Sequence, residues 1–211
     1  MKVLMLNGSP HEYGCSAEML KIMSKQFAGQ GVETEIVWIG TKPINGCVAC
    51  KQCVTTNRCA IDDGVNEFVD KLAQCDGLVI ACPVLCSSAP GALVSFLNRV
   101  IYSARGKRDI FAFKPAVGVV TARRAGTTST IDMLNRCLTY MEMLVVSGRY
   151  WPAVHGQIPE EIYHDEEGVQ VLEDLSDNMT WFMRCRQAAD DAGIPLPVRN
   201  SLPKTNFVRV K

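Results

Sequence analysis

The sequence lacks an excess of charge of either sign, and it lacks long apolar runs. Lys plus Arg total 22 and Asp plus Glu total 22, so the formal net charge is zero. Nucleic-acid surfaces and polybasic membrane anchors depend on an excess of positive charge, so we expect neither a nucleic acid nor a membrane as a partner. No stretch approaches the roughly 20 apolar residues that a transmembrane helix needs.

The amino terminus also lacks the apolar core of a secretion signal. Its start, MKVLMLNGSP, holds an apolar run of four residues, whereas a signal peptide needs about 7–15. The ten cysteines in these 211 residues therefore do not indicate a secreted disulfide scaffold. We expect reduced thiols and a cytoplasmic protein.

The apolar pattern alternates between the periods of strands and helices. Strands are predicted at Lys2–Leu6, Thr34–Ile39, Gly77–Cys82, Pro115–Thr121 and Leu144–Gly148. Helices are predicted at Ser16–Gly29, Asp63–Gln74, Gly91–Ser103, Thr128–Met143 and Glu167–Ala192. This repetition predicts an α/β fold with a doubly wound parallel sheet of about five strands. We expect one domain over residues 1–194 and a tail, 195–211, that packs on the surface or on a neighbouring subunit.

Four cysteines lie close together in one loop, residues 46–60. Cys47, Cys50, Cys53 and Cys59 have the spacing C-x2-C-x2-C-x5-C. Two-residue gaps let consecutive sulfurs turn toward one iron–sulfur cluster, and the spacing is close to the bacterial ferredoxin run. A tetrahedral zinc site is a second interpretation, although zinc sites usually use two separated cysteine pairs. Free or redox-active thiols are the third, and the spacing leaves all three open.

Three predicted loops lie where such sheets bind ligands. In a sheet with the order 2-1-3-4-5, ligands bind beyond the carboxyl ends of strands one and three. The first loop, Gly8–Ser16, precedes a helix amino terminus, where free N–H groups and the helix dipole favour a phosphate. Ser9 and Ser16 add hydroxyl donors, but the loop has neither the GK[ST] of a Walker loop nor the G-x-G-x-x-G of a dinucleotide site. A capped turn without a ligand is the alternative.

The second and third loops complete this edge of the predicted sheet. Residues Cys82–Leu93 expose backbone groups that can contact the edge of a planar ring. Residues Thr121–Thr128 place Arg123 and Arg124 after the fourth strand, where they can stabilise negative charge on a reduced ring or bind a nucleotide phosphate. A solvated basic turn is the alternative for the arginine pair.

Together, the three loops resemble those of the NADPH-dependent FMN reductase and iron–sulfur flavoprotein branch of the flavodoxin-like oxidoreductases, over nearly the whole chain. In that family a loop of the form G-S-P-R-x-x-G-x-T/S holds the FMN phosphate, and here His11 replaces the arginine. The family's second loop, P-V/I-Y-x5-G, flanks the flavin ring, and ARRAG resembles a paired-arginine form of the third. The resemblance implies a flavodoxin-like sheet in the order 2-1-3-4-5 with helices on both faces.

The resemblance also implies cofactors and the residues that bind them. NAD(P)H is the implied co-substrate, and the cysteine run sits where iron–sulfur flavoproteins of this branch carry their cluster, so one 4Fe–4S cluster on the four cysteines is an expectation. The implied FMN-binding residues are Ser9, His11, Cys15, Ser16, Pro83, Val84, Leu85, Cys86, Ser87, Ser88, Thr121, Ala122, Arg123, Arg124 and Gly126.

We expect an FMN-dependent oxidoreductase that transfers reducing equivalents from NAD(P)H to a flavin, a quinone or an electron carrier. No side chain is expected to be an obligatory nucleophile or base, although His155 could donate a proton to a reduced product. The flavin lies at the sheet edge in this fold, so a homodimer or homotetramer is expected to cover it. The alternatives are an iron–sulfur flavoprotein that carries single electrons and a non-enzymatic flavodoxin-like or metal-binding module.

Overall fold

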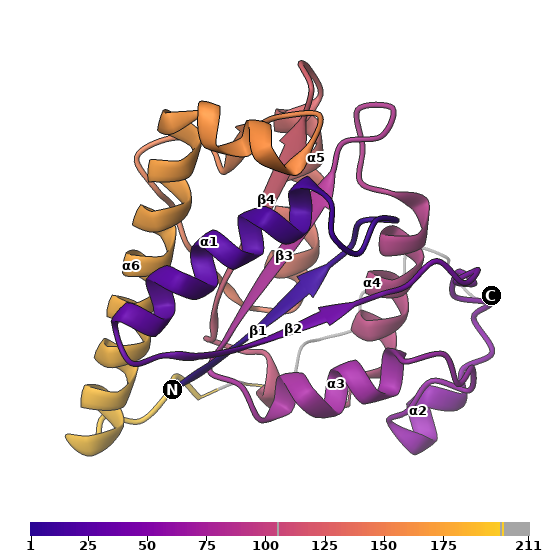
Figure 1. Cartoon of the computed structure of the whole chain (residues 1–211). Helices are drawn as coiled ribbons and strands as arrows, with labels where there is room; N and C mark the ends of the chain where they lie inside the picture. Colours follow the sequence, from indigo (N-terminus) through magenta and orange to yellow (C-terminus); the bar gives the residue numbers. More distant parts are fainter. Residues whose placement is uncertain (105, 199, 201–211) are drawn as a thin grey trace, which may run out of the picture.

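One parallel sheet runs through the middle of the molecule (Figure 1). The computed structural model describes residues 1–104, 106–198 and 200, so most of the predicted tail, 199 and 201–211, lies outside the described residues. The strands lie in the order β2-β1-β3-β4-β5, which confirms the predicted doubly wound α/β fold. Their bounds are β1 Lys2–Asn7, β2 Glu33–Trp38, β3 Gly77–Pro83, β4 Pro115–Ala122 and β5 Leu144–Val145.

The register brings the carboxyl ends of three strands to one edge. Asn7 of β1 lies beside Ala81 of β3, and Pro83 of β3 lies beside Thr121 of β4. The loops that follow these strands therefore leave the sheet next to one another. This is the edge where the sequence places the three predicted ligand loops.

The predicted fifth strand, Leu144–Gly148, is wrong in its extent. β5 stops at Val145, and a sixth strand, β6 (Ala153–His155), pairs with the far end of the same neighbour, β4. The chain between them does not belong to either strand, and in it Arg149 binds Asp174 of the last helix with an Nε–Oδ2 distance of 2.6 Å. The fifth position of the sheet is thus filled by two short strands.

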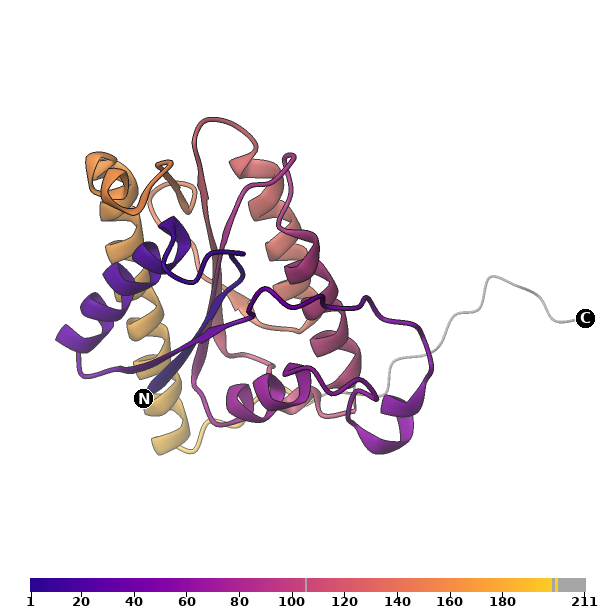
Figure 2. The same ribbon diagram turned by 45° about the vertical axis from the view of Figure 1, so that its right-hand side comes forward.

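Helices cover both faces of the sheet, as Figures 1 and 2 show. Alternate residues of β1 face opposite sides, so Leu4 and Leu6 pack in one core layer and Val3 and Met5 in the other. Helices on the face of Val3 and Met5 are α1 (Cys15–Gly29) and α6 (Glu166–Asp191). Those on the opposite face are α3 (Val65–Ala73), α4 (Gly91–Ser103) and α5 (Thr127–Tyr140). None of the described helices is both long and apolar enough to cross a bilayer.

Short helical segments connect these elements, and one of them corrects the prediction around the cysteines. α2 (Gln52–Thr56) lies inside the predicted cysteine loop. The 3-10 segments are η1 (Arg108–Ile110) and η2 (Pro159–His164). α3 begins at Val65 and not at the predicted Asp63, because Gly64 has a φ of +90° and the Asp63 carboxylate binds Arg99 of α4.

α4 separates the two parts of the molecule that carry the candidate chemistry. Its first residues, from Gly91, are the end of the second ligand loop, and its last turn lies beside the cysteine loop and α2 (Figures 1 and 2). Its 13 residues give a length of about 20 Å at 1.5 Å per residue. The ligand loops and the cysteines therefore sit at opposite ends of this helix.

Candidate functional site

The loops at the carboxyl edge of the sheet enclose an open groove of about 750 Å³. Four chain segments form its walls, one after each of β1, β3, β4 and β6. The groove is lined by Ser9, Pro10, His11, Glu12, Tyr13, Gly14, Cys15, Ser16, Pro83, Val84, Leu85, Thr121, Ala122, Arg123, Gly156, Gln157, Ile158 and Pro159. This is the edge at which doubly wound sheets bind their ligands.

The first loop is held in shape by polar contacts from within the fold. The side chain of Asn7 accepts a hydrogen bond from the Ser9 N–H at 3.1 Å and donates to the Glu12 carbonyl at 3.1 Å. The Trp38 indole N–H donates to the Ser9 carbonyl at 2.8 Å. No side chain caps the amino end of α1 after Gly14. The first N–H groups of that helix are therefore available to an anion in the groove.

The second and third loops are locked against each other. Leu85 and Ser88 exchange two backbone hydrogen bonds of 2.8 and 3.0 Å. Cys86 and Ser87 between them both have positive φ, 51° and 57°, as the centre of a type I′ turn requires. Gly126, with a φ of +91°, lies so close that a Cβ atom there would stand 2.9 Å from Cα of Ser87. Two backbone segments thus meet where a side chain has no room.

Two buried hydroxyl groups at the groove have no partner within the described part of the chain. Ser16 is 1% exposed and Thr121 is 3% exposed, and neither Ser16 Oγ nor Thr121 Oγ1 has a hydrogen-bond partner. A buried hydroxyl without a partner costs roughly 1–3 kcal/mol, so each such group requires an explanation, and a bound ligand at the groove provides one. Ser16 lies at the start of α1, where a phosphate would bind, and Thr121 lies near the end of β4, where the ring of a flavin would bind. The residues present fit the expected FMN.

The structure brings together most of the predicted flavin residues but not all of them. Those that line the groove are Ser9, His11, Cys15, Ser16, Pro83, Val84, Leu85, Thr121, Ala122 and Arg123. Those that do not line it are Cys86, Ser87, Ser88, Arg124 and Gly126. The central residues of the I′ turn, Cys86 and Ser87, do not line the groove, and Gly126 lies against Ser87. Arg123 and Arg124 are adjacent in sequence, yet one of them alone lines the groove.

His155 lies beside the groove and is held by an acid. The Asp165 carboxylate accepts the His155 backbone N–H at 2.7 Å and contacts the ring Nδ1 at 3.3 Å. It also caps α6 through the Gly168 N–H at 3.0 Å. Burial opposes ionisation of Asp165, but the hydrogen bonds from His155 and Gly168 prevail and lower its pKa. The His155 side chain is 49% exposed, and the residue that lines the groove is the next one, Gly156.

The sequence analysis missed one wall of the groove. Gly156, Gln157, Ile158 and Pro159 line it after β6, a strand that the apolar pattern did not separate from the preceding turn. Glu12 and Tyr13 of the first loop were also missed. The available signal was the rule already used for the other loops, because any segment that follows a parallel strand reaches this same edge.

The four clustered cysteines line a second cavity, of about 620 Å³, beside the last turn of α4. Burial raises the pKa of Cys53, and the thiols of Cys47, Cys50 and Cys59 raise it further, which reflects how near to one another they lie. Ala49, Lys51 and Asn57 adopt positive φ between 53° and 62°. Such left-handed residues turn the chain sharply and are a feature of backbone concavities that hold iron–sulfur groups and anions.

The cysteines surround this cavity without converging on one point. Within the described residues, no three His, Cys, Asp or Glu side chains lie close enough to hold a single metal ion. The structure therefore does not support the predicted 4Fe–4S cluster through a converged ligand set, and it does not support the zinc interpretation. The physical reason is that the four thiols line a cavity of about 620 Å³ and do not meet at one point. All ten cysteines of the chain are free.

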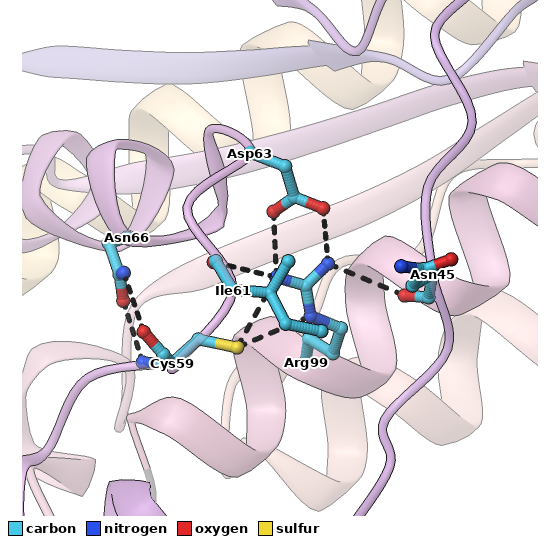
Figure 3. A network of polar contacts seen from close by, with 6 residues as sticks. All are labelled: Asn45, Cys59, Ile61, Asp63, Asn66 and Arg99. Atoms are coloured by element: carbon cyan, nitrogen blue, oxygen red, sulfur yellow. Dashed lines mark hydrogen bonds and ion pairs between the residues drawn. The ribbon is translucent and has the colours of Figure 1, made fainter.

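A buried arginine that the sequence analysis did not identify completes the cavity. Arg99 of α4 lines it and contacts Cys59, Asp63 and backbone carbonyls of the loop (Figure 3). The hydrogen bond to Asp63 raises the pKa of Arg99 above its ordinary value, although burial opposes this. A single arginine in an amphipathic helix resembles a surface residue, so no local signal in the sequence distinguishes it.

The chain has relatives whose names agree with this geometry. A solved structure of RosB, which contains the intermediate 8-demethyl-8-formylriboflavin-5'-phosphate, is similar in fold, with a TM-score of 0.68 at 15% identity, and the match covers 100% of this chain and 95% of RosB. An iron–sulfur flavoprotein of Methanocaldococcus jannaschii is 27% identical over 185 residues, 83% of this chain and 93% of the relative. An iron–sulfur flavoprotein of Archaeoglobus fulgidus is 30% identical over 163 residues, 77% of this chain and 72% of the relative.

The family assignment rests on a match that includes every residue of the groove lining except Ile158 and Pro159. The family model of NADPH-dependent FMN reductase matches residues 1–157. The same range contains the loop with the four cysteines and the whole of α4. The chain belongs to the NADPH-dependent FMN reductase family and is a flavin-dependent oxidoreductase.

Proposed function

We propose that this chain oxidises NAD(P)H with FMN bound in the 750 Å³ groove and passes the reducing equivalents to a flavin, a quinone or an electron carrier. The observation that carries the proposal is a pair of buried hydroxyls in residues that line that groove, Ser16 and Thr121, which have no hydrogen-bond partner among the described residues. Bound FMN would supply the hydride and single-electron chemistry, which belongs to the cofactor.

The protein's own residues bind, orient and stabilise charge. The N–H groups at the start of α1 and the Ser16 hydroxyl would hold the phosphate. Thr121 and the backbone of Pro83–Leu85 would contact the ring edge, and Arg123 would stabilise negative charge that develops there. His155, oriented by Asp165, is near enough in the chain to the groove wall to serve as a proton donor from its rim.

Two experiments test this proposal. Anaerobic addition of NADPH or NADH to protein loaded with FMN should bleach the flavin absorbance, and a protein that merely carries electrons between partners would not respond. Ser16→Ala should weaken FMN binding by about 1–3 kcal/mol, because a donor to a charged group is lost.

A matched control is available for that substitution. Ser176→Ala replaces a buried serine of α6 whose hydroxyl donates to the Leu172 carbonyl at 2.9 Å, and it should leave FMN affinity unchanged. Equal FMN affinity in the Ser16→Ala variant and the parent, measured by fluorescence titration, would remove this loop from the site.

A second candidate is an iron–sulfur flavoprotein that transfers single electrons to a redox-protein partner. The spacing of the four cysteines in the sequence supports it, because it is close to the bacterial ferredoxin run. The names of the archaeal relatives support it as well. Cys47, Cys50, Cys53 and Cys59 would be the ligands. Iron and sulfide analysis of anaerobically purified protein decides whether this candidate adds to the first.

We further propose that the chain works in a reducing compartment, the cytoplasm, as a homodimer or homotetramer. Ten free cysteines support the compartment. Exposed apolar residues at the split edge strand, Leu144, Val145, Tyr150 and Trp151, support association. Light scattering that reports a monomer at micromolar concentration would contradict the oligomer.

A further inference from the structure

The charges of this neutral chain are not evenly spread around the groove. Between Gly77 and Ile131 the sequence holds one acid, Asp109, and that residue lies in η1, beyond the last turn of α4. The second and third ligand loops both fall in this stretch. Neither of them contains a carboxylate, whereas the third contains Arg123 and Arg124. An anion beside these two loops therefore meets positive charge that no acid of either loop offsets.

Arg123 and Arg124 differ from the other arginines whose side chains the structure describes. Both are exposed, and within the described part of the chain neither has a hydrogen bond or an ion pair. The other six each donate to a carboxylate or a backbone carbonyl of the protein, and they are Arg58, Arg99, Arg136, Arg149, Arg184 and Arg186. The N–H donors of the pair are thus available to a ligand.

The backbone that leads to the arginine pair is fixed from both sides. The Val84 N–H, from the second loop, donates to the Thr121 carbonyl at 2.8 Å. The Gly156 N–H, from the wall after β6, donates to the Ala122 carbonyl at 3.2 Å. A ligand does not have to order this backbone when it binds, which removes one of the usual costs of association.

The two arginines occupy different places relative to the groove. Arg123 lines it and Arg124 does not, although their Cα atoms are about 3.8 Å apart. Arg124 therefore lies beside the groove, at its rim. The phosphate of FMN has its own place at the start of α1, with Ser16. An anion at Arg124 thus belongs to a second molecule and not to FMN.

We infer that Arg124 binds a phosphate group of NAD(P)H at the groove rim and holds the nicotinamide nucleotide in place against the flavin. This inference rests on the proposed function. NADH carries a diphosphate, and NADPH carries a further phosphate on the adenosine ribose. Arginine suits such groups because its planar fork donates two parallel N–H bonds to one phosphate.

The experiment compares Arg124→Gln and Arg124→Lys with the control Arg136→Gln, each in the full chain loaded with FMN. Arg136 is also exposed, it does not line the groove, and its Nε donates to the Asp132 carbonyl of its own helix at 3.3 Å. NADP+ and NAD+ are titrated into the oxidised protein by calorimetry, because the oxidised nucleotides bind without reducing the flavin. Rapid-mixing reduction at a series of NADPH concentrations gives the affinity where NADP+ binds too weakly.

Arg124→Gln should weaken NADP+ binding by at least about tenfold, because a charged donor to a phosphate is lost. Arg124→Lys, which keeps the charge and loses the fork, should weaken it less. FMN affinity by fluorescence titration and the circular dichroism spectrum should match the parent in all three variants, and Arg136→Gln should also match it in nucleotide affinity.

Every outcome bears on the inference. Weaker binding of NADP+ alone assigns Arg124 to the ribose phosphate, and weaker binding of both nucleotides assigns it to the diphosphate. Unchanged affinity for both would overturn the inference and leave a solvated basic turn. An equal loss in Arg136→Gln, or a matching loss of FMN affinity in Arg124→Gln, would overturn it too. So would a variant that does not fold, since the fold would then need Arg124 itself.

The inference and the proposed function fail in different ways. Bleaching of the parent flavin by NADPH or NADH tests the proposed function without any variant. If the parent is bleached and Arg124→Gln binds both nucleotides as tightly as the parent does, the inference alone is overturned. A parent that binds FMN but neither nucleotide, and is not bleached, would overturn both.

Discussion

The groove and the cysteine cavity lie at opposite ends of α4 and are built in opposite ways. The groove is made by strand ends, and two residues that line it, Ser16 and Thr121, carry buried hydroxyls with no hydrogen-bond partner in the described part of the chain. The cavity is made by a long connection, and its main polar group, Arg99, is fully engaged. Donors without partners in a groove can bind a ligand, whereas a buried charge whose partners are all present is part of the scaffold. The difference indicates that the groove is preorganised and that the cavity is held by one side chain.

Two glycines allow the rigidity of these regions to be compared directly. Gly126, which packs against the second ligand loop, and Gly64, beside the cysteine loop, both precede a helix, with φ of +91° and +90°. A Cβ at Gly126 would meet Val84 and Ser87, whereas a Cβ at Gly64 meets nothing within 4 Å. Gly126→Ala should therefore lower the free energy of unfolding by about 2–4 kcal/mol and weaken FMN binding. Gly64→Ala should cost about 1 kcal/mol, from backbone strain alone.

Urea unfolding and FMN titration of both variants measure this contrast. Gly64→Ala serves as the control because it introduces the same strain without the collision. Equal losses of stability would show that the second and third loops do not press against each other, and the groove would then be no more rigid than the cavity.

The unpartnered hydroxyls provide the second test. Thr121→Val should weaken FMN binding by about 1–2 kcal/mol, because a donor is lost, while stability without FMN stays the same or rises by up to about 1 kcal/mol. Thr180→Val is the control, since the Thr180 hydroxyl donates to the Ser176 carbonyl at 2.9 Å. It should cost about 1 kcal/mol of stability and leave FMN affinity unchanged. Thermal unfolding of protein without FMN gives one quantity, and fluorescence titration gives the other. A loss of stability in the Thr121→Val variant would show that the Thr121 hydroxyl does have a hydrogen-bond partner in the folded protein.

The smallest expected effect concerns the acid that holds the groove rim. Hydrogen bonds from His155 and Gly168 outweigh burial and lower the pKa of Asp165 below its usual 3.8. A lowered pKa in the folded state stabilises the protein at pH above the unfolded value, and this contribution is lost as the pH falls through the folded value. Asp165→Asn, which keeps a capping oxygen, should cost less than about 1 kcal/mol at pH 7. The difference from the parent should shrink below pH 3.8, as measured by urea unfolding at a series of pH values. A difference independent of pH would mean that the negative charge of Asp165 does not stabilise the groove rim.

The sheet and most of the groove followed from sequence patterns because their causes are local. Apolar runs such as Gly77–Cys82 form buried strands, and parallel strands bring the loops after them to one edge. The split of the fifth strand did not follow, because the apolar run Leu144–Gly148 carries no local signal of where its pairing with β4 stops. The contact of Arg149 with Asp174, 25 residues away, lies in the segment between the two short strands. The missing wall of the groove, Gly156–Pro159, has the same origin, since it follows the strand that this split creates.

The sequence by itself determined the order of the first five strands and of the long helices, three loops that could bind a flavin and the spacing of the four cysteines. The tertiary structure alone decided which donors stay unpartnered, which of Arg123 and Arg124 lines the groove, and that Arg99 meets Cys59 across 40 residues of chain. The physical reason is range. Periodicity and turn chemistry act between near neighbours, whereas burial and hydrogen-bond partners are set by segments that meet when the sheet is closed by its helices.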